Sequence, residues 1–354
     1  MYLTLGELRS DIYKLARSAS TNVIAGTTEL DRAINNAILS VSSSYPWRWR
    51  KYRVTIQTQA PYSTGTITLT GASRSVSGSG TSWTTGWTGM WLKVDGEAEW
   101  YPVKSISSTT ALTLETPYQG ANTGSGKSYT LYKRVYTLPS VVDDPSRRLI
   151  ISVNNACIDY MSQEKFDIQF LNHTHGYIYN YTLVDTSYTT RSYTTGTVAG
   201  TQGTATLTGT TTSWLGNVLE GDELEISSTK YTVLTVDSDT QITLAQLLQT
   251  SPSGTSYTVR SVRALNLEFG NIPDDEYNIE IPCHKRLYKV IDANDIIPIP
   301  TESINVVRYQ ATAEILAMHD STKSEKYEAM ADKEVQRMLT DQSFGVDNDV
   351  EVER

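Results

Sequence analysis

The tripeptide Thr81-Ser82-Trp83 recurs 131 residues later as Thr212-Ser213-Trp214, and both copies follow a Gly-Thr pair at the same interval. Further matched positions are Tyr101 and Tyr231, Leu114 and Leu244, and the segments 128–131 and 256–259. The offset between the copies drifts only from 131 to 128 over this span, which is too regular for shared low complexity. The sequence therefore predicts a duplicated domain.

Each copy has the local pattern of short antiparallel strands. Apolar and polar residues alternate in Leu92-Lys93-Val94 and Leu112-Thr113-Leu114, and again in Leu224-Glu225-Ile226 and Ile242-Thr243-Leu244. A period of two is typical of strands that bury one face. Because loops rich in Gly, Ser and Thr separate these strands, we expect each copy to form a small β-barrel or sandwich.

Apolar stripes at helical spacing lie outside the two copies. Residues three and four apart share one side of a helix, so such stripes predict helices that bury one face. Two stripes precede the first copy, two lie between the copies, and two follow the second copy. Their members are Leu5, Leu8, Ile12 and Leu15; Leu30, Ala33, Ile34, Ala37, Ile38 and Val41; Leu149, Ile150, Val153, Ala156, Cys157 and Tyr160; Phe166, Phe170, His173 and Tyr177; Ile304, Val307, Ala311, Ile315 and Met318; and Tyr327, Ala331, Val335, Met338 and Leu339.

No one of these three helical segments can bury its stripes alone, so we expect all three to pack on one another. The predicted fold class is α+β: a discontinuous helical-bundle core with two inserted, duplicated small antiparallel β domains. The expected divisions are 1–62 (N-terminal helices and a strand), 63–133 (first β domain), 134–193 (central helices of the core), 194–262 (second β domain), 263–342 (strands and the C-terminal helical pair) and 343–354 (a flexible acidic tail).

Bulk composition narrows the class of protein. The 354 residues carry a net charge of -9 with a sequence pI of about 5.1, whereas tight, sequence-independent nucleic-acid binding needs a basic footprint. No apolar run approaches the roughly 18–20 residues of a membrane span, and no secretory signal follows Met1, so we expect synthesis in a cytoplasm. The two cysteines, Cys157 and Cys283, have no CxxC partner, which argues against a disulfide framework or a cysteine zinc site.

Two motifs raise the question of a chemical site. The segment 124–128 (Gly-Ser-Gly-Lys-Ser) resembles the end of a phosphate-binding loop, but Ala121 stands where the first Gly belongs and strand patterns lie on both sides. His173 and His175 would point to different sides of a helix and lack a nearby acidic or Cys ligand. We therefore predict no catalytic residue, no metal site and no cofactor, and no enzymatic activity.

Polar clusters beside prolines are interpreted as structural. The acidic runs 143–144 and 274–276 each neighbour a Pro and predict a helix cap or a turn. The basic-aromatic segment Trp47-Arg48-Trp49-Arg50 allows base stacking or phosphate steering as one function. The favoured interpretation is that its Trp residues anchor a strand to the helical core while its Arg residues face acidic neighbours.

Two features together resemble the head-to-tail adaptor proteins of tailed bacteriophages, particularly the short-tailed ones. One is an N-terminal helical pair that ends in Pro46-Trp47-Arg48-Trp49 and a strand, and the other is a C-terminal helical pair introduced by Ile297-Pro298-Ile299-Pro300. The β domains also look like small domains inserted in such phage proteins. The resemblance implies a non-enzymatic virion protein at the head–tail interface. About a dozen copies would form a ring between the portal protein and the tail or nozzle, in non-specific proximity to the genomic DNA in the channel.

Two other functions stay open at this point. One is a tail-tube, nozzle or capsid-decoration component, and the other is a carbohydrate-binding adhesin whose β domains hold sugar with Trp and Tyr. The flanking helices weigh against the adhesin. For the adaptor, we expect the last helix and the tail to form the main contact with the portal protein, and we expect no contact with a membrane. The candidate interface residues are Tyr327, Val335, Met338 and Leu339.

Overall fold

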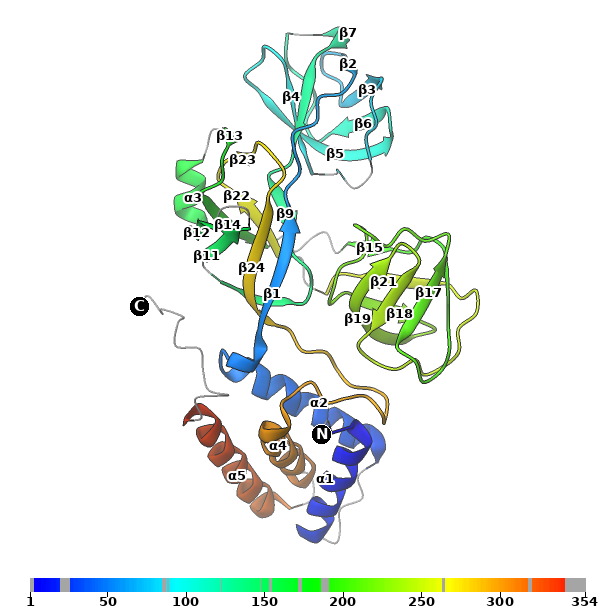
Figure 1. The fold of residues 1–354 in the computed structure, drawn as a ribbon, viewed down its shortest axis with the longest axis vertical. Helices are drawn as coiled ribbons and strands as arrows, with labels where there is room; N and C mark the ends of the chain where they lie inside the picture. Colours follow the sequence, from blue (N-terminus) through cyan, green and yellow to red (C-terminus); the bar gives the residue numbers. More distant parts are fainter. Residues whose placement is uncertain are drawn as a thin grey trace.

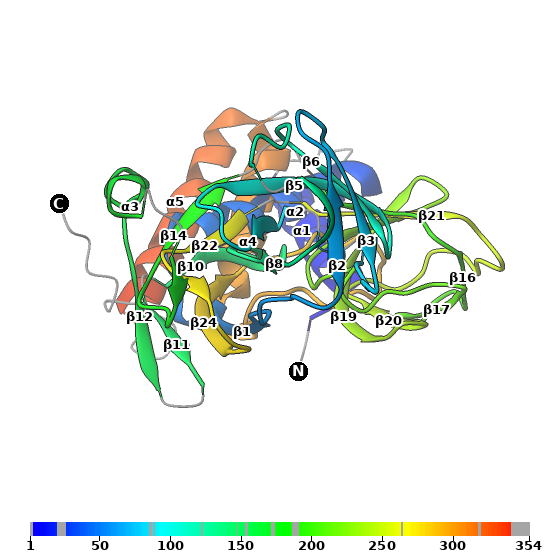
Figure 2. The ribbon, with the colours of Figure 1, turned by 90° about the horizontal axis from the view of Figure 1, so that it is seen from above.

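The computed structural model describes residues 3–19, 26–84, 87, 89–121, 123–146, 148–152, 155–170, 174–185, 191–262, 265–317 and 320–340. Figure 1 shows four units: a helical bundle built from both ends of the chain, a central sheet above it, one β domain at the far end and a second β domain beside the sheet. Figure 2 shows the same units from above, with the second β domain again displaced to one side. Within the described residues, no helix has the length and apolar character needed to cross a membrane.

The helical bundle forms where the sequence predicts the terminal helices. Most described residues of the four apolar stripes are buried in one core with Trp47, so the predicted terminal pairs are confirmed; Leu15 is partly buried, and Met318 lies outside the described residues. The connection before the last pair carries Ile297 and Ile299 into the same core, without helix or strand. The helices are α1 (Leu5–Ala19), α2 (Thr27–Ser44), α4 (Ile304–Ala317) and α5 (Ser321–Thr340), with short 3-10 turns at Arg48–Arg50 and Thr301–Ser303.

The predicted helical core between the β domains is wrong, and with it the fold class. Described strand residues make up 38% of the chain and helical residues 26%. Residues 134–193 contribute mainly strands to an eight-stranded central sheet with the order β1-β24-β11-β12-β14-β22-β9, in which β10 also pairs with β24. The strands are β1 (Lys51–Gln57), β9 (Val135–Thr137), β10 (Val142–Pro145), β11 (Arg148–Ile151), β12 (Ala156–Tyr160), β14 (Asn180–Asp185), β22 (Leu265–Phe269) and β24 (Asn278–Lys285); α3 (Gln163–Gln169) lies beside them, and β13 (His175–Gly176) pairs with β23 (Ile272–Pro273).

The physical reason for the error lies in a hairpin that mimics a helical stripe. In β11, Leu149 and Ile151 are buried, whereas Arg148 is exposed and Ile150 is only partly buried, which is the period of two of a strand. Asn155 has a φ of 53°, a left-handed conformation that Asn tolerates in tight turns, and it leads into β12. Cys157, expected on the buried stripe, is exposed, and Val153 lies outside the described residues. Likewise Asp144-Pro145, expected to start a helix, ends strand β10.

The two β domains share one strand arrangement. The first follows the order β7-β2-β3-β6-β5-β4-β8, and the second follows β16-β17-β20-β19-β18-β21-β15, so each strand from β2 to β8 except β7 has a counterpart. Register shifts in the long strand also match, at Val103/Ser105 and Val233/Thr235. The strands are β2 (Thr66–Leu69), β3 (Ser75–Ser79), β4 (Trp91–Val94), β5 (Trp100–Ser108), β6 (Ala111–Leu114), β7 (Gly124–Lys127) and β8 (Tyr129–Tyr132); and β15 (Ser192–Tyr193), β16 (Thr197–Gly200), β17 (Thr206–Thr210), β18 (Glu223–Ile226), β19 (Thr229–Ser238), β20 (Gln241–Leu244) and β21 (Tyr257–Arg260).

Matched hydrogen bonds confirm the predicted equivalence of the repeated residues. The indole N–H of Trp83 donates to the Tyr129 hydroxyl at 2.9 Å, and that of Trp214 donates to Tyr257 at 2.8 Å. Each Tyr hydroxyl then donates to the backbone carbonyl before the Gly-Thr pair, at 2.8 and 2.7 Å. Burial raises the pKa of both tyrosines to about 12. The same buried dyad therefore organises both domain cores.

Candidate functional site

A hollow in the described structure lies where the second β domain, the central sheet and the bundle meet. The connector that leaves β24 at Lys285 runs between α2 and the second β domain and forms the floor of a cavity of about 690 Å³. A smaller cavity of about 460 Å³ continues along α2. Because both cavities are lined by Leu39, Arg286 and Leu287, we treat them as one groove, called the junction groove.

Exposed apolar side chains gather around the junction groove. Leu39 of α2 is 37% exposed, Leu234 of β19 is 36% exposed, and Val262 after β21 is 45% exposed. All three line the same cavity although they come from different units of the fold. Exposed apolar residues scattered singly are ordinary, but several around one hollow mark an interaction site. The groove therefore offers an apolar lining to a partner.

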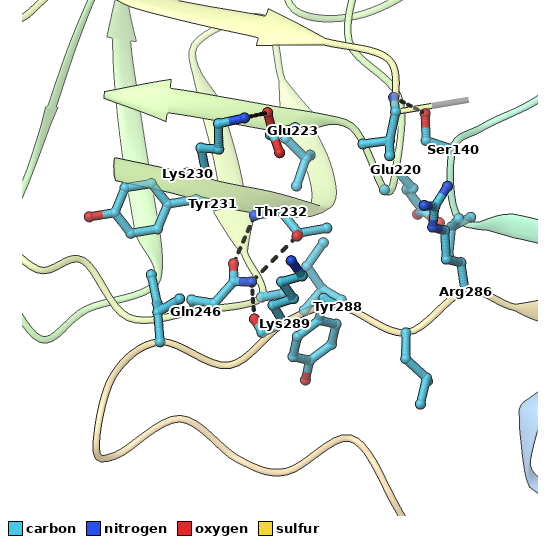
Figure 3. Close-up of a pocket in the computed structure, with 18 of the residues that line it drawn as sticks. Ser140, Glu220, Glu223, Lys230, Tyr231, Thr232, Gln246, Arg286, Tyr288 and Lys289 are labelled. Carbon is cyan, nitrogen blue, oxygen red and sulfur yellow. Dashed lines mark hydrogen bonds and ion pairs between the residues drawn. The ribbon is translucent and has the colours of Figure 1, made fainter. Parts of the chain in front are cut away.

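A buried hydrogen-bond network holds the connector against the second β domain. The side-chain carbonyl of Gln246 accepts from the Thr232 backbone N–H at 2.7 Å, and its amide donates to the Lys289 carbonyl at 2.6 Å (Figure 3). The buried carboxylate of Asp295 accepts from the backbone N–H of Leu247 at 2.9 Å and from that of Ile291 at 2.8 Å. These bonds give the groove a fixed shape before any partner arrives.

A second buried network holds the same domain against the central sheet. Asp222 is fully buried, forms an ion pair with Arg191 and accepts from the Ser140 hydroxyl at 2.8 Å. Burial raises the pKa of Asp222 above its ordinary value, and the Arg191 charge opposes that rise. Beside this network, Gly221 has a φ of 82°, and a Cβ there would lie 2.2 Å from the Val141 nitrogen. The chain can approach this closely only with Gly at that position.

The groove has an excess of positive charge. Its lining holds five cationic residues and three acidic ones: Arg50, Lys230, Lys285, Arg286 and Lys289 against Asp143, Glu220 and Glu223. The acids are already engaged by the chain itself, since Arg50 pairs with Asp143, Lys230 pairs with Glu223 at 2.8 Å (Figure 3), and the Tyr52 hydroxyl donates to Glu220 at 3.1 Å.

Two of these cations remain available to a partner, while Lys285, which forms no ion pair in the described part of the chain either, lies over the Tyr52 ring at 5.2 Å from the centroid. Among the described residues, neither Arg286 nor Lys289 forms an ion pair with a carboxylate. Both belong to the connector that forms the floor of the groove. The groove therefore favours an occupant that is both apolar and acidic.

The structure places the predicted interface residues elsewhere. Tyr327 and Met338 are buried in the bundle core, and Val335 and Leu339 are partly buried against it. All four lie on the face of α5 that packs within this chain, and none lines the junction groove. A buried side chain cannot contact a partner unless the bundle opens, so Tyr327 and Met338 are accounted for by the fold, whereas a partner role for the partly buried Val335 and Leu339 stays a prediction.

The other motifs also find structural roles. Gly124–Lys127 is strand β7, and strand β8 rather than a helix follows Ser128, so the backbone cradle of a phosphate-binding loop does not form there. The His175 ring packs near Tyr132 at 5.9 Å between centroids, while His173 lies outside the described residues. In the acidic run 274–276, Asp274 accepts from the Tyr277 hydroxyl at 2.7 Å, as expected of a turn.

The basic-aromatic segment 47–50 anchors strand β1 to the bundle, as the favoured interpretation of the sequence predicts. Trp47 is fully buried in the bundle core, and its indole N–H donates to the Val41 carbonyl at 2.6 Å. Trp49 packs against the same core. Arg50, 5% exposed, bonds to the Ser42 and Lys285 carbonyls and pairs with Asp143. This segment therefore joins the bundle to the central sheet.

Sequence reasoning missed the junction groove, although α2 carries one signal of it. Leu39 falls outside the stripe from Leu30 to Val41 and is a large apolar residue on an outward face. Arg286 and Lys289 lie in a connector without periodicity, where no pattern was available. No protein-family model matches this chain, and no curated protein matches it in sequence.

Proposed function

We propose that this chain is a structural virion protein: a head-to-tail adaptor of a tailed bacteriophage, at the interface between portal and tail. In this proposal about a dozen copies form a closed ring around the DNA channel, with the portal protein on one side and the tail or nozzle protein on the other. The protein acts through assembly and carries out no chemical reaction.

The observation that carries the proposal is the bundle made from both ends of the chain. The N-terminal pair α1–α2 and the C-terminal pair α4–α5, which separately resemble adaptor elements, pack on one core (Figure 1). Arg50, in the segment after α2, ties that core to the sheet through the Lys285 carbonyl of β24 and the Asp143 carboxylate of β10. A bundle fixed in this way is a rigid body to which a portal ring can bind.

The asymmetry of the molecule supports a ring. The second β domain and the junction groove lie on one side of the bundle, and α5 lies on the other side (Figures 1 and 2). Contacts between different faces of identical copies are heterologous, and they close into rings when the rotation permits. The net charge of -9 supports a channel that does not hold the phosphate backbone.

The alternative functions differ in how they fit the β domains. A sugar-binding adhesin would need exposed aromatic rings, but the repeated Trp83 and Trp214 are 1% and 0% exposed. Those residues organise domain cores and are not available to stack on sugars. A tail-tube, nozzle or capsid-decoration role uses the same kind of assembly surface, so it is separated from the adaptor by its binding partner.

Co-sedimentation with portal rings encoded by the same genome tests the proposal. We expect the purified chain to be monomeric alone and to sediment with portal rings at about one copy per portal subunit. A matched variant, Ala311→Asp, buries a charge in the bundle and should not co-sediment. If the folded wild-type chain stays in solution with portals but binds tail tubes or capsids, the alternative roles hold instead.

A further inference from the structure

The junction groove requires an occupant with acidic and apolar residues, and the C-terminal sequence has this composition. Residues 341–354 lie outside the described residues, and they contain five acidic residues and one Arg. Phe and three Val residues are interspersed among them, and Val and Glu alternate in Val350-Glu351-Val352-Glu353, just before Arg354. Alternation of this kind lets an extended chain present apolar side chains to one surface and carboxylates to another.

The position of the last helix indicates which copy supplies this segment. Helix α5 ends at Thr340 and lies on the side of the bundle away from the second β domain, which forms one wall of the junction groove (Figures 1 and 2). Fourteen further residues, fully extended, reach at most about 46–50 Å. In a ring of identical copies, heterologous contacts pair one face of each subunit with a different face of the next, and the α5 side and the groove side are two such faces.

We propose that residues 341–354 of one copy bind in the junction groove of the neighbouring copy. The acidic side chains lie against Arg286 and Lys289, two groove cations that form no ion pair with a carboxylate among the described residues. The Phe and Val side chains cover Leu39, Leu234 and Val262. This inference rests on the proposed ring, which it deepens by naming the contact between subunits.

The contact is expected to be weak for a single pair of copies. A short segment loses conformational freedom when it orders on a surface, which offsets part of the apolar and ionic gain. Affinity in the range of about 10–100 μM leaves the isolated chain monomeric at low concentration, while a portal template that aligns the copies makes the contact effectively intramolecular. Because ion pairs at an open groove are screened, binding should weaken as salt increases.

Peptide binding tests the inference without the portal. A fluorescent peptide of residues 341–354 is titrated into a chain that ends at Thr340 and retains every described helix and strand. Far-UV circular dichroism and thermal unfolding verify that this chain is folded. We expect saturable binding that drops tenfold or more in Arg286→Glu/Lys289→Glu. The control Lys326→Glu/Lys333→Glu makes the same charge change on exposed positions of α5 and should bind like the parent.

Three results would overturn the inference: no saturation at millimolar concentration, equal binding of a scrambled peptide, or equal binding by the groove variant. Dilute full-length chain should bind the peptide as the shortened chain does. If it does not, the segment occupies its own groove and the neighbouring-copy contact is wrong. Peptide binding without portal co-sedimentation would refute the proposed function alone, and the reverse result would refute this inference alone.

Discussion

Removing one hydroxyl from either β domain should destabilise that domain by nearly the same amount. Tyr257→Phe removes the hydrogen bonds to Trp214 and to the Thr195 carbonyl, and Tyr129→Phe removes their counterparts to Trp83 and the Thr64 carbonyl. The matched bonds differ in length by 0.1 Å between the two domains. Each bond contributes about 0.5–1.5 kcal/mol, and the indole N–H left without a partner is buried and adds a desolvation cost. We expect a loss of about 2–4 kcal/mol in each domain.

Hydrogen exchange followed peptide by peptide measures this loss separately in each domain, because domains of a larger chain can open independently. Peptides from 192–260 should lose protection in Tyr257→Phe, and peptides from 66–132 should lose it in Tyr129→Phe. The control Tyr179→Phe changes a side chain that is 59% exposed and should shift protection by less than about 0.5 kcal/mol. A loss above about 2 kcal/mol in one domain with less than about 0.5 in the other would refute the equivalence of the two cores.

Three further outcomes are expected. Excising 64–130 and closing the gap with a short linker should preserve the far-UV helical signal, because the bundle core contains no residue from that domain; loss of that signal would contradict the independence of the first β domain. The raised pKa of Asp222 means that the folded state binds a proton there more tightly than the unfolded chain, so wild-type stability should fall as pH rises from 3.8 through the raised folded pKa. Urea titrations should show this fall in the free energy of unfolding, by at most about 1.4 kcal/mol per pH unit, and Asp222→Asn should lack it. If the free energy of unfolding changed with pH in the same way in both proteins, Asp222 would not be the source of the pH dependence. Calorimetry should detect no ATP binding by the wild type or by Lys127→Ala. A heat of ATP binding in the wild type that Lys127→Ala abolishes would contradict the interpretation of segment 124–128 as a strand without a phosphate site.

The duplicated domains and the terminal helices could be predicted because their signals are local. A repeat at nearly constant offset identifies equivalent positions such as Trp83 and Trp214 without any knowledge of the fold. The α2 stripe similarly repeats over many residues, which makes its period unambiguous. Long periodic segments and repeated motifs therefore gave reliable expectations.

The central sheet could not be predicted because its pairing is non-local. Ile151 pairs with Ile279, and Lys51 pairs with His284, across more than a hundred residues of intervening sequence. Strand preference depends on such neighbours more than on local sequence, so a four-residue apolar run is compatible with either structure. The junction groove has the same origin, since Leu39, Leu234 and Arg286 meet only after three units of the fold have packed together.

Electron cryomicroscopy of the virion that contains this chain tests the central claim most directly. The account predicts a ring of about a dozen copies between portal and tail, in which each copy fits as a helical bundle with a central sheet and two similar β domains. It also predicts density in each junction groove that continues from α5 of the adjacent copy. A virion in which the portal meets the tail directly, with this chain located on the capsid surface or within the tail tube, would contradict the account.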